Sequence, residues 1–106
     1  MTVAHIILLK FKPSVSEEQA QDVLKKVADL KNKLTVVESV HLGVNFSARS
    51  KGFTHGFTML FKDRAALETY DKSSEHVDAV TNHIRPNIED ILAFDYDVEE
   101  YSIPRL

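Results

Sequence analysis

The chain contains no cysteine, and this absence removes two kinds of chemistry at once. Without thiols the protein has no disulfide framework and no thiolate metal site. It also has only three glycines among its 106 residues. So few glycines cannot assemble a glycine-rich phosphate loop or a dinucleotide-binding fingerprint, and no GxSxG nucleophile motif is present. The sequence therefore lacks the common signatures of nucleotide binding and of serine hydrolysis.

Long apolar runs and clusters of basic residues are missing as well. The run AHIILL, residues 4–9, is ended by Lys10 and Lys12 and is too short for a signal-peptide core or a membrane span. The formal net charge is −3, so the chain offers no basic field to nucleic acid or to an anionic membrane. We therefore expect a cytoplasmic protein that binds neither nucleic acid nor membrane. Its length indicates a single domain over residues 1–106, with a core small enough that oligomerisation would help it.

Hydrophobic periodicity predicts strands and helices in a regular order. Strands are expected at four places, residues 2–12, 36–46, 53–62 and 93–101. An amphipathic helix is expected over 17–33, because Ser16 and Gln19 have the spacing of a capping box. Asp63 is expected to cap a short helix at 64–70, Ser73 or Ser74 a longer one at 75–84, and Pro86 to open a last helical turn at 86–92.

This order is that of the ferredoxin-like βαββαβ protomer, an α+β fold. We expect a four-stranded antiparallel or mixed sheet with helices on one face, and the first strand beside the third at its centre, running parallel to it. The first strand has two apolar faces, so the face without helices needs a cover. A second copy of the chain is the economical cover, which predicts a homodimer through Ala4, Ile6 and Leu8. Residues 94–106 are expected to reinforce the contact by reaching along the partner.

Two histidines lie within predicted core strands, His5 in VAHIILLKF and His55 in GFTHGF. Both fall on the strand faces that the helices cover, where neighbouring strands would set them side by side. Tyr70 and His76 flank the capping serines of the later helix and could point at the same pocket. Three simpler interpretations stay open: buried histidines bonded to backbone carbonyls, helix-end packing for Tyr70, and a capping role for His76. A metal site made by His5, His55 and His76 is a further alternative. His41 and His83 are assigned no role.

Four segments resemble the stress-responsive A/B barrel (Dabb) domain family, and they occur in the expected order over nearly the whole chain. They are HIILLKFK at 5–12, GFTHGF at 52–57, ALETYDKSSEHV at 66–77 and RPNIEDILAFDY at 85–96. The family implies a dimeric α+β barrel, in which the sheets of two ferredoxin-like protomers pack face to face. This agrees with the dimer predicted from the two-sided first strand.

The family includes a plant polyketide cyclase that folds a linear poly-β-ketone by aldol chemistry, and its polar pocket positions match His5, His55, Tyr70 and His76. The resemblance therefore implies a cofactor-free cyclase or lyase acting on a hydrophobic small molecule. His76 would be the catalytic base and Tyr70 a catalytic hydrogen-bond donor. The predicted substrate-binding residues are His5, His55, Ile7, Leu9, Val23, Leu24, Val27 and Phe57. Other members imply two alternatives: a stress-responsive dimeric or oligomeric protein that binds a small molecule without chemistry, and a cofactor-free oxygenase.

Overall fold

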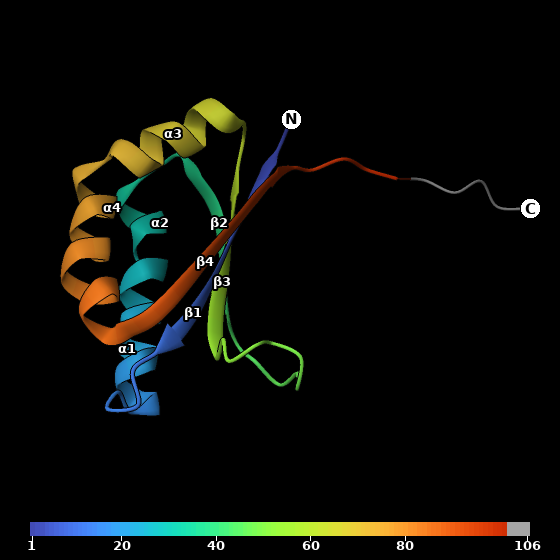
Figure 1. Cartoon of the computed structure of the whole chain (residues 1–106). Helices are drawn as coiled ribbons and strands as arrows, with labels where there is room; N and C mark the ends of the chain where they lie inside the picture. The colour runs from blue at the N-terminus through green and yellow to red at the C-terminus, as the bar shows by residue number, and fades with distance from the viewer. Residues whose placement is uncertain (102–106) are drawn as a thin grey trace, which may run out of the picture.

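Four strands and one layer of helices make up the described part of the chain, residues 1–101, in a computed structural model (Figure 1). The strands are β1 (Val3–Phe11), β2 (Val37–Val44), β3 (His55–Phe61) and β4 (Ile88–Asp97). The α-helices are α1 (Glu17–Ala28), α2 (Leu30–Lys33), α3 (Arg64–Lys72) and α4 (Ser74–Ala79). A π-helical segment, η1 (Val80–Ile84), and a 3₁₀ turn, η2 (Arg85–Asn87), join α4 to β4. The predicted βαββαβ order and the α+β class are confirmed.

The sheet has the strand order β2-β3-β1-β4, and every neighbouring pair is antiparallel. The prediction that β1 lies beside β3 at the centre is confirmed, but the predicted parallel direction is wrong. The crossover through α1 keeps β1 parallel to β2, whereas the short connection from β2 to β3 reverses the chain. Since β3 follows β2 in a hairpin and lies between β2 and β1, it must run antiparallel to both.

The helices cover only one face of the sheet (Figure 1). On α1 the side chains of Ala20, Val23, Leu24 and Val27 are buried against the sheet, as the helical spacing predicts. The predicted helix over 17–33 is interrupted at Asp29, which separates α1 from α2. The Asp29 carboxylate accepts a hydrogen bond from the Asn32 side chain at 3.0 Å, and this local bond accompanies the new turn. The interruption leaves Leu30 buried beside the other helical layer residues.

The segment before the last strand differs from the prediction. Pro86 does lie in a helical turn, but this turn is the short η2, and β4 begins at Ile88 rather than at residue 93. The spacing of Ile88, Ile91 and Leu92 fits a helix in isolation, yet this stretch forms antiparallel pairs with β1. An irregularity between Lys10 and Phe11 in this pairing accommodates the extra residue, Glu89. Pairing with a central strand thus overrides the local helical spacing.

The other end of β4 leads away from the domain. The strand ends at Asp97, and the Val98 N–H donates to the Thr2 carbonyl at 2.7 Å. Beyond this bond the chain continues outward to an exposed Tyr101 (Figure 1). The predicted contact of residues 94–106 with a partner therefore falls in part on residues 102–106, which lie outside the described residues. Within residues 1–101 no helix is long and apolar enough to cross a membrane.

Candidate active site

A cavity of about 250 Å³ lies between the helix-covered face of the sheet and the helices. Its polar lining residues are His5, Tyr70, Asp71, His76 and Asp95. Its remaining lining is apolar and consists of Ile7, Val27, Leu30, Phe57, Ala79, Val80, Ile84, Ile91 and Ala93. A mostly hydrophobic wall with a few convergent polar groups is typical of a small-molecule site.

His76 owes its position to the serine that begins α4. Ser73 is the N-cap of that helix, and its hydroxyl accepts a hydrogen bond from the His76 N–H at 3.1 Å. On the ring, Nδ1 lies 3.0 Å from the Asp71 carbonyl oxygen. A carbonyl can only accept, so Nδ1 carries the proton and the neutral ring keeps its lone pair on Nε2. The backbone therefore selects the tautomer that a general base requires.

Tyr70 is a ring neighbour of both histidines of the cavity. Its ring centroid is 4.6 Å from that of His76 and 6.1 Å from that of His5. The residue is only 2% exposed, and its hydroxyl has no hydrogen-bond partner within residues 1–101. Burial raises the pKa of this phenol, so it stays protonated at neutral pH. An unpaired, protonated hydroxyl beside a cavity is free to donate to a ligand.

His5 has a carboxylate partner that the sequence did not reveal. Its Nδ1 lies 2.5 Å from an Asp95 carboxylate oxygen, and the two residues are direct neighbours in the β1–β4 register. His5 is 7% exposed, whereas the Asp95 side chain is 42% exposed. The alternation of the last strand already set Asp95 on the face opposite Phe94 and Tyr96. Only the pairing of β4 with β1 identifies His5 as its neighbour.

His55 lies elsewhere, and the prediction that it sits beside His5 is wrong. In the antiparallel register His5 pairs with Met59, while His55 pairs with Leu9, four residues further along β1. At about 3.3 Å per residue this separates the two histidines by roughly 13 Å along the strand. The Glu17 carboxylate at the start of α1 accepts a hydrogen bond from His55 Nε2 at 2.8 Å.

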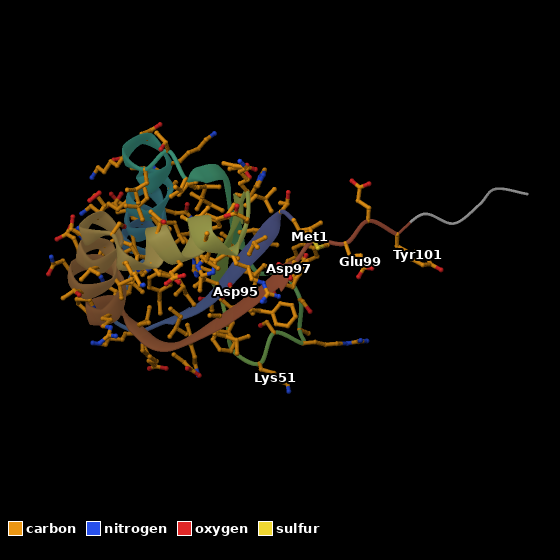
Figure 2. The ribbon with its side chains drawn as sticks, turned by 90° about the horizontal axis from the view of Figure 1, so that it is seen from above. Met1, Lys51, Asp95, Asp97, Glu99 and Tyr101 are labelled. Atoms are coloured by element: carbon orange, nitrogen blue, oxygen red, sulfur yellow. The ribbon has the colours of Figure 1, made fainter. Side chains whose placement is uncertain are left out.

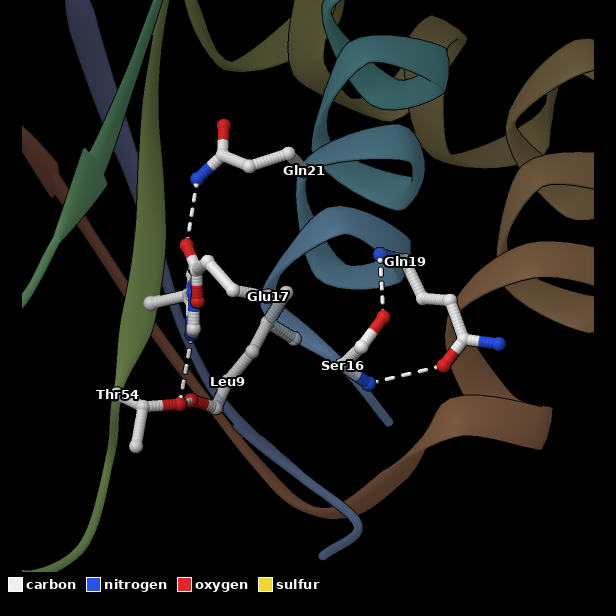
Figure 3. Close-up of polar contacts among 7 residues, drawn as sticks. Leu9, Ser16, Glu17, Gln19, Gln21 and Thr54 are labelled. Carbon is white, nitrogen blue, oxygen red and sulfur yellow. Dashed lines mark hydrogen bonds and ion pairs between the residues drawn. The ribbon is translucent and has the colours of Figure 1, made fainter. Parts of the chain in front are cut away.

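The surroundings of His55 are those of a structural contact between β3 and α1. Its Nδ1 is 2.7 Å from the Thr54 hydroxyl, so both ring nitrogens have partners. Hydrogen bonds from Gln21 and His55 lower the pKa of Glu17, and Figure 3 shows the bond from Gln21. The imidazole thus ties the sheet to the first turn of α1, where Ser16 and Gln19 form the predicted capping box.

The other predicted pocket residues divide into two groups. Ile7, Val27 and Phe57 line the cavity, together with His5. Leu9, Val23 and Leu24 are buried in the hydrophobic core and do not line it. The separation of His55 from the other histidines also removes the three-histidine metal site, and no group of three potential metal ligands is present within residues 1–101.

The model of the stress responsive A/B barrel domain matches residues 3–98 of this chain. The chain belongs to the Dabb family. A stress-response A/B barrel domain-containing protein of Arabidopsis thaliana, HS1, is 28% identical over 95% of this chain and 94% of its own length. Olivetolic acid cyclase of Cannabis sativa is 30% identical over 91% of this chain and 96% of its own length.

Solved structures agree with the fold of this Dabb domain. Hydroxynitrile lyase from Passiflora edulis superposes with a TM-score of 0.87, at 21% identity, and 97% of each chain is covered. A dimeric protein of ferredoxin-like fold from Bacteroides fragilis superposes with a TM-score of 0.72, at 22% identity, over 92% of this chain and 96% of the other. At these identities the likeness establishes the ferredoxin-like fold and nothing about chemistry.

Proposed function

We propose that this Dabb protein is a cofactor-free acid–base enzyme that acts on a hydrophobic β-keto compound by aldol-type chemistry, as a cyclase or a lyase. The observation that carries the proposal is a pair of rings in one largely apolar cavity. The Asp71 carbonyl holds Nδ1 of His76, and the centroid of the Tyr70 ring is 4.6 Å from that of His76. Aldol chemistry needs these two groups together: a base to remove a proton next to a carbonyl, and a donor to stabilise the enolate that forms.

His76 is the general base in this proposal. Its Nδ1–H is held by the Asp71 carbonyl, so Nε2 can accept the α-proton of the substrate without a change of tautomer. The same hydrogen bond steadies the imidazolium that results, because the carbonyl dipole points its negative end at the ring. A positioned base of this kind contributes about 10²- to 10⁴-fold to the rate.

Tyr70 donates to the carbonyl oxygen on which the enolate charge develops. A hydroxyl already aimed at that charge, in a site that excludes most water, is worth far more than the same group in solution. The apolar residues Ile7, Val27 and Phe57 would hold the carbon skeleton of the substrate. The 30% identity to olivetolic acid cyclase over most of the chain supports a poly-keto substrate class.

The test is turnover of a panel of tetraketide and related β-ketoacyl substrates. His76→Ala should lower kcat by about 10²-fold or more, because the base is lost. His83→Ala is the matched control, since His83 lies on η1 and does not line the cavity. Equal turnover by wild type and His76→Ala would remove the assigned base, and turnover loss in both histidine variants would indicate a structural effect.

A binding function without chemistry is the second candidate, and the similarity to the stress-response protein HS1 favours it. The cavity would then bind a small hydrophobic molecule through the same apolar wall, and Tyr70 and His76 would only orient it. Ligand-induced thermal stabilisation without product formation, over the whole substrate panel, would support this candidate against the enzyme.

We also propose that the protein forms a homodimer through the sheet face that carries no helices. Of the three residues predicted for this contact, Ala4 is already only 2% exposed in the protomer, which leaves Ile6 and Leu8 of β1. The strand β4 adds the exposed side chains of Leu92, Phe94 and Tyr96. A patch of this kind is unusual on a monomer. The dimeric state of the Bacteroides fragilis neighbour supports a homodimer.

A further inference from the structure

We propose that His5 and Asp95 form a second acid–base couple in the cavity, in which His5 delivers a proton to the electrophilic carbonyl oxygen and Asp95 is its positioning residue. This inference rests on the proposed aldol-type function. The base His76 and the donor Tyr70 account only for the formation of the enolate. The second carbonyl, which the enolate carbon attacks, becomes an alkoxide and needs a proton of its own.

The contact between the two side chains fixes the orientation of the His5 ring. An ionised carboxylate only accepts hydrogen bonds, so the 2.5 Å contact means that Nδ1–H donates to Asp95. The second ring nitrogen, Nε2, has no hydrogen-bond partner within residues 1–101. This nitrogen is not sealed from solvent. His5 lines the cavity, so this nitrogen is the one left for a ligand.

The position of His5 relative to Tyr70 suits a second oxygen of the same substrate. The two ring centroids are 6.1 Å apart, and Tyr70 is a ring neighbour of both His5 and His76. A β-keto compound carries its carbonyls a few ångströms apart, so one oxygen can meet Tyr70 while a folded chain brings another to His5. The three side chains thus supply a base, a hydrogen-bond donor to the enolate and a proton donor to the second carbonyl.

A neighbouring ion pair leaves the Asp95 carboxylate free for His5. Asp97 lies two residues further along β4 on the same strand face, and Figure 2 shows both aspartates on this strand. The nearby guanidinium of Arg64 donates to Asp97 at 3.1 Å from Nε and lowers the pKa of that carboxyl. The cation is therefore engaged by Asp97, and the negative charge of Asp95 faces the imidazole.

The protons balance over the step. His76 Nε2 takes the α-proton, the α-carbon forms a bond to the second carbonyl carbon, and the π electrons of that carbonyl move to its oxygen. The oxygen takes the Nε2 proton of a doubly protonated His5, which is left neutral with Nδ1–H still on Asp95. His76 then returns its proton to water and His5 takes one back, so no oxidant or co-reactant is consumed.

The test compares two aspartates of one strand in the turnover assay. Asp95→Asn keeps the shape of the side chain and removes its charge. It should lower kcat by about 10²-fold or more with KM within about threefold, because a positioned imidazolium loses its carboxylate. Asp90→Asn, which changes an aspartate of the same strand that does not line the cavity, should keep wild-type kcat.

A double-mutant cycle separates this role from a purely structural one. Since Asp95 acts through His5, adding Asp95→Asn to His5→Gln should lower kcat no further than His5→Gln alone. If Asp95→Asn does not fold, Asp95→Glu replaces it and should keep more of kcat than His5→Gln does. Wild-type kcat in Asp95→Asn, or additive losses in the double variant, would overturn the couple while the proposed function stands. No turnover by the wild type on any β-keto substrate would overturn the function and the couple with it.

Discussion

Tyr70 combines two properties that rarely occur together in a residue selected for stability alone. Its ring is almost fully buried against Phe61 and the two cavity histidines, which is a large hydrophobic contribution. Its hydroxyl nevertheless has no partner within residues 1–101, although buried tyrosine hydroxyls usually find one. No residue of 1–101 bonds this hydroxyl, so it remains available to a molecule in the cavity, in keeping with its proposed role as a donor.

This contrast leads to a prediction for Tyr70→Phe. The variant should be as stable as the wild type or slightly more stable, because it removes an unsatisfied polar group and keeps the packed ring. Its kcat should fall by about 10²-fold or more, because the donor to the enolate is lost. Chemical denaturation gives the first quantity and turnover of a β-ketoacyl substrate the second.

The control for Tyr70→Phe is Tyr101→Phe, the same substitution at a highly exposed tyrosine on the segment beyond β4 (Figure 2). It should change neither quantity. A loss of about 1 kcal/mol or more in Tyr70→Phe would show that the hydroxyl has a structural partner after all.

The sequence was a good guide to residues whose surroundings are local. Tyr70 and His76 flank the capping serine between α3 and α4, and their ring centroids lie 4.6 Å apart. The partners of Asp95 and His55 could not be predicted in this way, because they lie 90 and 38 residues away along the chain. Only the register of the sheet assigns Asp95 to His5, and a spacing argument cannot supply a register.

At the scale of elements, one serine couples the two helices that carry the proposed catalytic residues. Ser73 accepts a hydrogen bond from the His76 N–H, and its hydroxyl also donates to the Tyr70 carbonyl at 2.7 Å. It therefore ends α3 and begins α4 in one place. The relative position of Tyr70 and His76 depends on this junction more than on either helix alone.

Ser73→Ala should accordingly lower both stability and turnover. The loss of an N-cap costs about 0.5–2 kcal/mol, and a misplaced base lowers kcat as well. Ser16→Ala is the matched control, since Ser16 caps α1 with the same geometry and Gln19 as partner, far from the cavity lining. It should cost a similar free energy of unfolding and leave kcat unchanged. Equal effects of the two variants on kcat would contradict a positioning role for Ser73.

Elements themselves were predictable where one period dominates. β1 and α1 have uniform two-residue and helical spacing, and both appear within two residues of the expected starts. Residues 88–92 were misread, because apolar residues at helical spacing also occur in a strand with apolar side chains on both faces. Ile91 lines the cavity, whereas Leu92 is exposed on the opposite face. Pairing with β1 makes this segment a strand, and the two paired strands lie at opposite ends of the sequence.

At the scale of the whole molecule, the two faces of the sheet differ in a way that one chain does not resolve. The helix-covered face holds the core and the cavity. The other face presents Ile6, Leu8, Leu92, Phe94 and Tyr96, and no helix or strand of residues 1–101 covers it (Figure 1). Phe94 is 58% exposed there. Burying side chains of this size is worth roughly 1.5–3 kcal/mol each, so a second sheet against this face would add substantially to a small domain.

The homodimer is tested by a charge placed at the centre of that face and another at its edge. Ile6 lies on the central strand β1, between Thr58 of β3 and Phe94 of β4, so Ile6→Asp should give insoluble or unfolded protein. A carboxylate enclosed there costs several kcal/mol, which a domain of this size cannot absorb.

Phe94→Asp should instead give a folded monomer, because Phe94 lies on the edge strand and is exposed in the protomer. Sedimentation should find the wild type dimeric at micromolar concentration, with an unfolding midpoint that falls on dilution. A wild type that sediments as a folded monomer, with an unfolding midpoint independent of protein concentration, would contradict the proposed homodimer. In that case the apolar sheet face would need another partner, and Ile6→Asp should then remain soluble.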